Sequence, residues 1–253
     1  AGRVQSPALR MLCEREDEIA KFIPREYWSV DADAEKSKQN FPARLLELQG
    51  TKVEQFTITN EAQAAAARQT IEQAANGVLT VANVDRKQRK RNPSPPFTTS
   101  TMQQEAARKL GFGAQRTMRL AQNLYEGVDF GEGAVGLITY MRTDSLNLAT
   151  EAVAEIRQVI AKLYGEEGLA EGPRVYKNKS KNAQEAHEAI RPTSATVTPD
   201  QLEGKIDPDQ LKLYALIGKR AVASQMAPAL YDTVAVDLVT GTDVAKRTAA
   251  FRA

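Results

Sequence analysis

The chain has 253 residues, of which 26% are charged, with one cysteine, one histidine and a formal net charge of +2. This length allows a real core and more than one domain, whereas a single cysteine excludes an internal disulfide and a cysteine-rich zinc site and suits a reducing cytosol. The small net charge excludes a strong polycation, so a nucleic-acid site would need local clusters of basic residues. No apolar run approaches the roughly 20 residues of a membrane span and no signal peptide opens the chain, so we expect a soluble, intracellular protein.

The first predicted element is a helix that starts at Ser6, a good N-cap residue before Pro7, and ends at Pro24. Its apolar residues recur at helical spacing, at Leu9, Leu12, Cys13, Ile19, Ala20 and Ile23. We expect this stripe to face a core, with Cys13 packed as a small hydrophobe. Because the chain opens inside a motif and without methionine, we also expect residues upstream of it in the intact protein.

Three short strands are predicted next, at residues 27–30, 43–48 and 53–56, with polar, turn-rich segments between them. The first strand runs into the acidic sequence DADAE at 31–35. Alternating carboxylates can hold Mg²⁺, and they can equally form a solvated turn. The residues alone leave both interpretations open.

A helix capped by Asn60 and stopped by Gly77 follows, and then a strand over 78–84. That strand leads into a basic cluster at 85–91 and a proline-rich stretch at 92–96. The prolines predict an extended connector, which we interpret as an interdomain hinge. A basic cluster is usually a solvated surface, although clustered Lys and Arg side chains can also contact DNA phosphates.

The next region is mainly helical. Apolar spacing predicts helices at 100–110, 114–125, 150–164 and 208–226, and alternation predicts strands at 231–240 and 244–251. The glycine break between the first two helices gives a helix-turn-helix arrangement, a pattern that occurs in many folds. The glycine-rich stretch 127–133 is not a phosphate loop, because no Gly-Lys-Ser/Thr follows it.

The segment Gly136–Ser145 combines an apolar lead-in of strand character with a tyrosine and an arginine two residues apart. In an extended backbone Tyr140 and Arg142 would share one face, with Met141 turned to the other. A phenol beside a guanidinium suits attack on a phosphodiester, because the fixed charge favours an ionised phenol and binds the phosphate. From spacing alone, a buried tyrosine on a core strand is the commoner explanation.

His187, the only histidine, follows a basic loop and is expected on a short helix that ends before Pro192. The loop contains Lys177, Lys179 and Lys181. A lone histidine is more often structural than catalytic.

Four segments, in this order, closely resemble the type IA DNA topoisomerases, above all the bacterial topoisomerase I branch. They are GRVQSPALR at 2–10, FTTSTMQQ at 97–104 with KLGF at 109–112, GLITYMRTDS at 136–145, and QEAHEAIRPT at 184–193. Met141 favours that branch, because a proline there would resemble topoisomerase III. The resemblance implies a multidomain α+β fold in which a mainly helical, helix-turn-helix-like tyrosine domain is inserted into a β-rich arch.

In domain terms the resemblance implies a partial base or gate segment with the N-terminal helix at 1–35, followed by the first part of the arch at 36–99. The tyrosine-bearing domain then covers 100–226, and return strands of the arch cover 227–253. The family has no metal site at 31–35, which favours the solvated turn there.

The resemblance also implies a reaction. The tyrosine cleaves single-stranded DNA, becomes joined to the 5′ phosphate, lets another strand pass and religates without ATP, which relaxes negative supercoils. By motif position Tyr140 is the nucleophile, Arg142 positions the scissile phosphate, and His187 holds DNA and couples its binding to domain opening. Further DNA-binding candidates are Arg3, Gln5, Thr143, Asp144, Ser145 and Arg191, although Arg191 could equally brace its own loop.

No metal ligand is expected within this chain, because the Mg²⁺-binding Toprim domain of the family lies outside it, as do the C-terminal modules. We therefore expect the chain to bind single strands weakly and not to cleave or relax DNA alone. The expected partners are single-stranded and negatively supercoiled DNA, and the expected state is a monomer in the bacterial cytoplasm, at the nucleoid.

Two other classes of protein also fit the sequence. One is a non-catalytic single-stranded nucleic-acid-binding module in which Tyr140 stacks on bases. The other is a different tyrosine-nucleophile enzyme, a recombinase or a relaxase, although one histidine excludes a three-histidine metal site.

Overall fold

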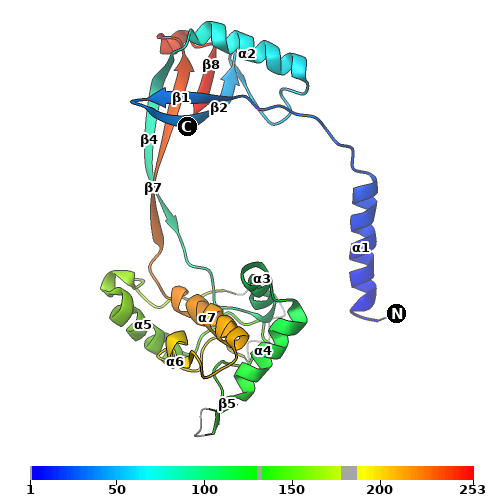
Figure 1. Ribbon diagram of the computed structural model, residues 1–253, viewed down its shortest axis with the longest axis vertical. Coiled ribbons are helices and arrows are strands. Elements are labelled where there is room, and N and C mark those ends of the chain that lie inside the picture. Colours follow the sequence, from blue (N-terminus) through cyan, green and yellow to red (C-terminus); the bar gives the residue numbers. More distant parts are fainter. Residues whose placement is uncertain (1, 130–132, 178–186) are drawn as a thin grey trace. The chain divides into compact units, whose positions relative to one another are not determined.

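The computed structural model describes residues 2–129, 133–177 and 187–253, which form two compact units (Figure 1). Unit 1 comprises Ala1–Gln88 and Asp232–Ala253, and unit 2 is the single stretch Arg89–Tyr231 between them. Helices and antiparallel strands occur together, so the predicted α+β class is confirmed. Within the described ranges, no helix is both long and apolar enough to cross a bilayer.

Unit 1 begins with helix α1 (Gln5–Ala20), none of whose residues is buried. The predicted cap was wrong: Val4 occupies the N-cap position, and Ser6 N already donates to Gly2 O at 3.1 Å, so the first turn forms upstream of Ser6. The prediction of a packed apolar stripe was also wrong, since Leu12 is 64% exposed and Cys13 is exposed. The helical spacing of apolar residues predicts an amphipathic helix, but it does not show that another part of the protein covers the apolar side.

The sheet of unit 1 has the strand order β1-β2-β8-β7-β4, with the short β3 paired to β2. The strands are β1 (Asp31–Lys36), β2 (Gln39–Leu48), β3 (Thr51–Lys52), β4 (Leu79–Arg91), β7 (Ala229–Thr240) and β8 (Ala249–Arg252). The pairs β1–β2, β2–β8 and β7–β8 are antiparallel. A 3₁₀ turn, η2 (Val244–Lys246), lies between β7 and β8, where a continuous strand was predicted.

Helix α2 (Glu61–Ala75) packs on this sheet and begins at its predicted N-cap residue. Asn60 accepts a hydrogen bond from Gln63 N, and Asn76 ends the helix in the left-handed conformation. Ile71 of α2 joins the buried apolar residues of the sheet, which are Ala43, Leu45, Leu238, Ala249 and Phe251. Burial of this face holds helix and sheet together.

Two charged segments lie in strands where none was predicted. Residues 31–35 form most of β1 rather than a turn: the alanines lie half-buried against β2 while Asp31, Asp33 and Glu35 stay exposed. The basic cluster 85–91 continues β4, where the predicted strand ended at 84, and residues 86–91 are exposed, as a solvated surface predicts. Lys87 O accepts a hydrogen bond from Thr233 Oγ1 at 2.9 Å. The predicted strand at 27–30 is irregular, since Trp28 N bonds to Ile58 O instead of a ladder partner.

Unit 2 is mainly helical, as predicted. Its elements are α3 (Thr99–Leu110), α4 (Ala114–Glu126), the two-residue strands β5 (Val128–Asp129) and β6 (Ala134–Val135), α5 (Thr150–Tyr164), η1 (Glu166–Gly168), α6 (Pro199–Leu202) and α7 (Pro208–Ala223). Thr98 and Thr101 form a capping box at the start of α3, and Gly111, with φ of +68°, ends it. Side chains of α3, α4 and α7 surround Leu137, Ile138 and Met141 in one core.

Candidate active site around Tyr140

The chain from Gly136 to Thr139 is held in an extended form between α4 and residues 190–193. Leu137 N donates to Leu124 O at 2.7 Å, and Thr193 N donates to Leu137 O at 3.0 Å. Thr139 N donates to Arg191 O at 2.9 Å, and Ile138 forms an antiparallel bridge with Pro192. The predicted strand character is therefore reduced to one bridge, which still fixes the register of the residues that follow.

Residues 140–145 alternate between exposed and buried side chains. Tyr140, Arg142 and Asp144 are exposed, whereas Met141, Thr143 and Ser145 are buried. Tyr140 is 38% exposed and Met141 is fully buried. Tyr140 and Arg142 therefore share a face and Met141 takes the other, as the extended backbone predicts. The alternative of a buried core tyrosine does not hold for Tyr140.

The exposed side chains open onto a groove of about 720 Å³ in unit 2. Its lining comes from the start of α3, from α4, from the Tyr140 segment and from the loop that begins at His187. The lining residues are Thr98, Thr99, Ser100, Gln103, Met118, Tyr140, Arg142, Thr143, Asp144 and His187. The rings of Tyr140 and His187 lie 5.7 Å apart, and Tyr125 lies 5.4 Å from Tyr140 in an edge-to-face arrangement. The fold thus brings together Tyr140, Arg142, Asp144 and His187.

Thr99 joins α3 to the tyrosine segment, and sequence analysis missed it. Its hydroxyl donates to Met141 O at 2.7 Å and accepts from Thr143 N at 2.9 Å. Only its position inside the FTTSTMQQ motif could have pointed to it, because its partners are backbone atoms far along the chain. Tyr125 was missed for a similar reason, since its ring contact with Tyr140 depends on how α4 packs.

The prediction of a short helix around His187 was wrong for the part that the structure describes. Residues 187–191 are not helical, and residues 184–186 and the lysines at 179 and 181 lie outside the described ranges. Ile190 N donates to Phe97 O at 2.8 Å and Ala189 N donates to Asn147 O at 2.8 Å. These hydrogen bonds to distant parts of the same chain take the place of helical ones. They hold the loop so that the exposed His187 lies at the groove.

The side chains of Thr143, Ser145 and Arg191, all of them DNA-binding candidates, form hydrogen bonds with nearby residues. The Thr143 hydroxyl accepts from Ser145 N at 3.0 Å, and the Ser145 hydroxyl accepts from Asn147 N at 3.1 Å, so both stabilise local turns. Arg191 Nε donates to Glu188 at 2.8 Å and its Nη1 donates to Pro192 O at 2.9 Å. The contacts of Arg191 match the alternative that it braces its own loop.

Arg3 and Gln5 belong to unit 1, where both are exposed at the start of α1. Nothing in the described contacts assigns them a ligand, and their part in DNA binding stays a prediction.

The described residues offer no group of three or more His, Cys, Asp or Glu side chains that could hold a metal ion. The alternating carboxylates of β1 do not fit such a site, because they are spread along an exposed strand and Asp31 is paired with Arg44 at 3.1 Å. Where Mg²⁺ binds in the intact protein stays a prediction.

Comparison with known proteins decides the family, since a model of the DNA topoisomerase family matches residues 1–251. The chain belongs to the DNA topoisomerase family. DNA topoisomerase 1 of Xylella fastidiosa is 57% identical over 244 residues, which cover 96% of this chain and 30% of the relative. DNA topoisomerase 1 of Rickettsia felis is 51% identical over 239 residues, or 94% of this chain and 30% of the relative. The resemblance found in the four motifs is confirmed.

The full-length topoisomerase I of Thermotoga maritima has a similar fold, with a TM-score of 0.78 and 34% identity. The similarity covers 100% of this chain and 38% of that structure. This topoisomerase chain therefore spans roughly a third of the length of the relatives it matches.

Proposed function

We propose that this chain is the central part of a type IA DNA topoisomerase and supplies the nucleophile for transient cleavage of single-stranded DNA. The observation that carries the proposal is the shared exposure of Tyr140 and Arg142 on one groove, beside His187. Its lining combines the guanidinium of Arg142 with the aromatic rings of Tyr140 and His187, and sites for single strands combine positive charge with aromatic side chains.

In the proposed step, the Tyr140 phenol oxygen attacks a phosphodiester phosphorus. A bond from this oxygen to phosphorus forms and the bond from phosphorus to the 3′ oxygen breaks, so the 5′ phosphate stays on the tyrosine. The phenol proton is lost and the departing 3′ oxygen gains a proton, which leaves a free 3′ hydroxyl. Religation is the reverse, and it needs no ATP because the phosphotyrosine keeps the energy of the phosphodiester.

Arg142 would bind the non-bridging phosphate oxygens with its guanidinium and stabilise the charge that grows on them. His187, next to the Tyr140 ring, would contact the bound strand and couple binding to movement of the tyrosine-bearing unit. Asp144 is exposed on the same face. Thr143 and Ser145 would act indirectly, by shaping the backbone that presents Tyr140.

The remaining parts of the proposal concern the longer protein. Mg²⁺, held outside this chain by a Toprim domain, would supply positive charge near the DNA phosphates. We propose that unit 2 is the tyrosine-bearing domain and that the sheet of unit 1 belongs to the arch. The full enzyme would act as a monomer on single-stranded and negatively supercoiled DNA in the bacterial cytoplasm, and this chain alone would not relax DNA.

The experiment that tests the proposal is complementation. The chain is mixed with a separately prepared Toprim-containing N-terminal piece, Mg²⁺ and a single-stranded oligonucleotide labelled at its 3′ end, the end that stays on the tyrosine-linked fragment. Covalent adducts are then separated under denaturing conditions. We expect an adduct that forms only with both pieces and that is absent for Tyr140→Phe.

Two outcomes would contradict the proposal. An adduct that survives Tyr140→Phe would place the nucleophile elsewhere. DNA binding by both folded pieces without any adduct would favour the non-catalytic binding module, in which Tyr140 stacks on bases.

A further inference from the structure

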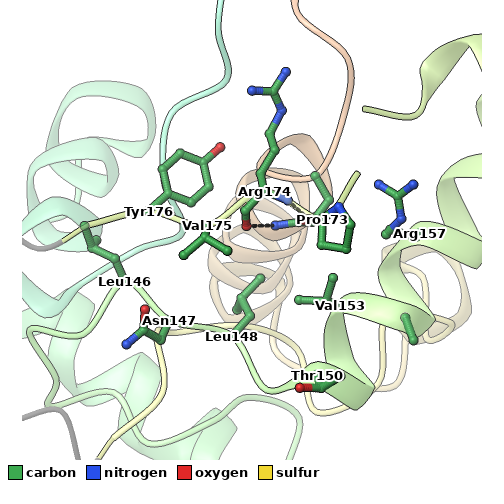
Figure 2. Close-up of a pocket in the computed structure, with 12 residues that line it drawn as sticks. Leu146, Asn147, Leu148, Thr150, Val153, Arg157, Pro173, Arg174, Val175 and Tyr176 are labelled. Atoms are coloured by element: carbon green, nitrogen blue, oxygen red, sulfur yellow. Dashed lines mark hydrogen bonds between the residues drawn. The ribbon is translucent and has the colours of Figure 1, made fainter. Parts of the chain in front are cut away.

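A second cavity lies in unit 2, and the segment that follows Ser145 forms one of its walls (Figure 2). It has a volume of about 450 Å³, which is in the range of small-molecule sites. Its walls are residues 146–148, the first half of helix α5 from Thr150 to Arg157, residues 173–176 and Gln225. The proposed reaction uses none of these residues.

The cavity has an apolar body. The side chains of Leu148, Val153 and Val175 lie between Arg157 on one side and Tyr176 on the other in Figure 2, together with Pro173. Val175 is 82% exposed, so part of the apolar wall is in contact with water. Such a wall favours a ligand with a compact hydrocarbon or aromatic part.

The charged groups of the cavity are all positive among its described lining residues. Arg157 and Arg174 are both half-buried, and neither forms an ion pair with a described carboxylate. Arg157 Nη2 donates to Ala170 O at 3.1 Å and Arg174 Nε donates to Met226 O at 2.9 Å, so carbonyl groups hold both side chains. Arg157 Nη1 is buried with no hydrogen-bond partner in the described part of the chain. An uncompensated, partly buried guanidinium favours an anion nearby.

The walls of the cavity are held in place before any ligand binds. Gln225 fixes residue 174 by two bonds: Arg174 N donates to Gln225 Oε1 at 3.0 Å, and Gln225 Nε2 donates to Arg174 O at 3.1 Å (Figure 2). The Tyr176 hydroxyl donates to Ser224 O at 2.8 Å, and burial raises the pKa of Tyr176 above its ordinary value. A pre-formed wall lowers the entropy cost of binding.

We propose that this cavity binds a small organic anion: a carboxylate with a compact apolar body, whose head lies toward Arg157 and Arg174. The site is separate from the Tyr140 groove, and the proposal does not depend on the topoisomerase reaction. Asn147 connects the two places, because it lines the cavity while its carbonyl accepts from Ala189 N, two residues after His187.

The test measures binding of 1-naphthoate to the full 253-residue chain by calorimetry. Two further probes separate charge from body: 1-naphthalenemethanol has the body without the charge, and inorganic phosphate has charge without the body. We expect both to bind at least about tenfold more weakly than 1-naphthoate, since the site needs both features.

Three variants locate the site. Arg157→Gln removes the charge and should weaken 1-naphthoate binding at least about tenfold. Val153→Phe fills the cavity from α5 and should abolish binding while Arg157 stays in place. Lys162→Gln removes an exposed charge from the same helix, outside the cavity, and should leave affinity within about twofold.

The proposal is overturned if 1-naphthoate does not bind, or if Val153→Phe has no effect, because the anion would then lie outside the cavity. It is also overturned if Arg157→Gln and Lys162→Gln weaken binding equally, since attraction would then depend on general surface charge. Equal binding of phosphate and 1-naphthoate would instead indicate a phosphate contact of the kind DNA makes. If Arg157→Gln does not fold, Val153→Phe and the two probes still decide.

Discussion

Thr99 and Thr143 are joined by hydrogen bonds that run in both directions between them. Thr99 N donates to the Thr143 carbonyl at 2.9 Å, and Thr143 N donates to the Thr99 hydroxyl at 2.9 Å. The first residue of α3 therefore holds the backbone directly after Arg142. The shape of the proposed catalytic segment depends on a helix start that lies outside the segment.

Thr99→Val should damage this arrangement while keeping the side-chain volume. The change leaves Thr143 N and Met141 O without the hydroxyl, which costs about 1–3 kcal/mol of unfolding free energy. Adduct formation in the complementation assay should fall about tenfold, because the phenol is less well placed. Thr99→Ser keeps the hydroxyl and serves as the control. If Thr99→Val matches the wild type in unfolding free energy and in adduct formation, the hydrogen bonds of the Thr99 hydroxyl do not matter for positioning.

Arg142→Gln should affect chemistry without affecting folding. The Arg142 side chain is exposed, so its unfolding free energy should change by less than about 0.5 kcal/mol. The adduct rate should fall by about 100-fold or more, and Arg142→Lys should restore only part of it, because an ammonium lacks the planar two-pronged geometry. Arg108→Gln, an exposed charge on α3, is the matched control. An unchanged adduct rate in Arg142→Gln would make Arg142 an ordinary surface charge.

Glu188 connects two parts of the loop around His187, and Glu188→Ala should loosen them. Its Oε1 accepts from Ala149 N at 2.9 Å and its Oε2 accepts from Arg191 Nε at 2.8 Å, where the Arg191 side chain is only 15% exposed. Loss of the carboxylate leaves a largely buried guanidinium unpaired and should cost about 1–3 kcal/mol in denaturant unfolding. If Arg191 braces the loop, Arg191→Ala should lower stability similarly and change oligonucleotide affinity little. A large loss of affinity at full stability would instead make Arg191 a phosphate ligand.

Gly136→Ala should be destabilising, because an added Cβ would lie 2.7 Å from the carbonyl oxygen of Tyr125. Backbone on one side must then move, at a cost of about 1–3 kcal/mol. Gly218→Ala is the matched control: its Cβ would meet only Pro192 Cγ at 3.7 Å, and alanine in a helix gains about 0.5–1 kcal/mol over glycine. Thermal unfolding should therefore move in opposite directions for the two variants, and a stable Gly136→Ala would show that this contact relaxes freely.

Tyr214 should make the protein sensitive to alkaline pH. Its side chain is 1% exposed and its hydroxyl donates to Val197 O at 2.7 Å. Burial, with a smaller effect of Glu155, raises the pKa of Tyr214 from its ordinary value of 10.0 to about 12. The unfolded chain loses this proton at lower pH than the folded chain does, so the contribution to stability is complete below pH 10 and declines as pH rises from 10 toward 12.

Tyr214→Phe cannot ionise, and it also loses the bond to Val197. The wild type should therefore be more stable than Tyr214→Phe at pH 9, and the difference in thermal midpoint should narrow at pH 11. A constant difference across this range would show that Tyr214 titrates alike in both states.

Local signals predicted helices well and strand partners poorly. Helix α5 has the predicted bounds, 150–164, and α2 lies between its predicted caps, because apolar period and capping are properties of neighbouring residues. The strand predicted at 27–30 failed because alternation indicates an extended chain without naming a partner. Residues 31–35 show the converse, since their alternation is that of an edge strand but their composition resembles a turn.

At the site, period-two alternation placed Tyr140 and Arg142 on one face, because that relationship is local. The arrival of His187 beside Tyr140 could be expected only from the family resemblance. No local sequence pattern predicts the hydrogen bonds with Phe97, Asn147 and Arg191, which bring the Tyr140 segment and the His187 loop together. The buried roles of Thr143 and Ser145 follow from the same alternation, which a motif match alone does not distinguish from ligand contact.

Adjacent residues from Tyr140 to Ser145 have different roles. Every second side chain faces solvent, where it can contact DNA, and the side chains between them are buried in the core. The register of the backbone along this stretch, which decides the side chains that face solvent, is therefore as important as residue identity. Deleting a single residue between Gly136 and Tyr140 would exchange the two sets, which would turn a phenol and a guanidinium inward and a methionine outward. A change of length upstream of Gly136 should leave this alternation in place, because the bonds from Leu137 N and Thr139 N fix which side chains face the core.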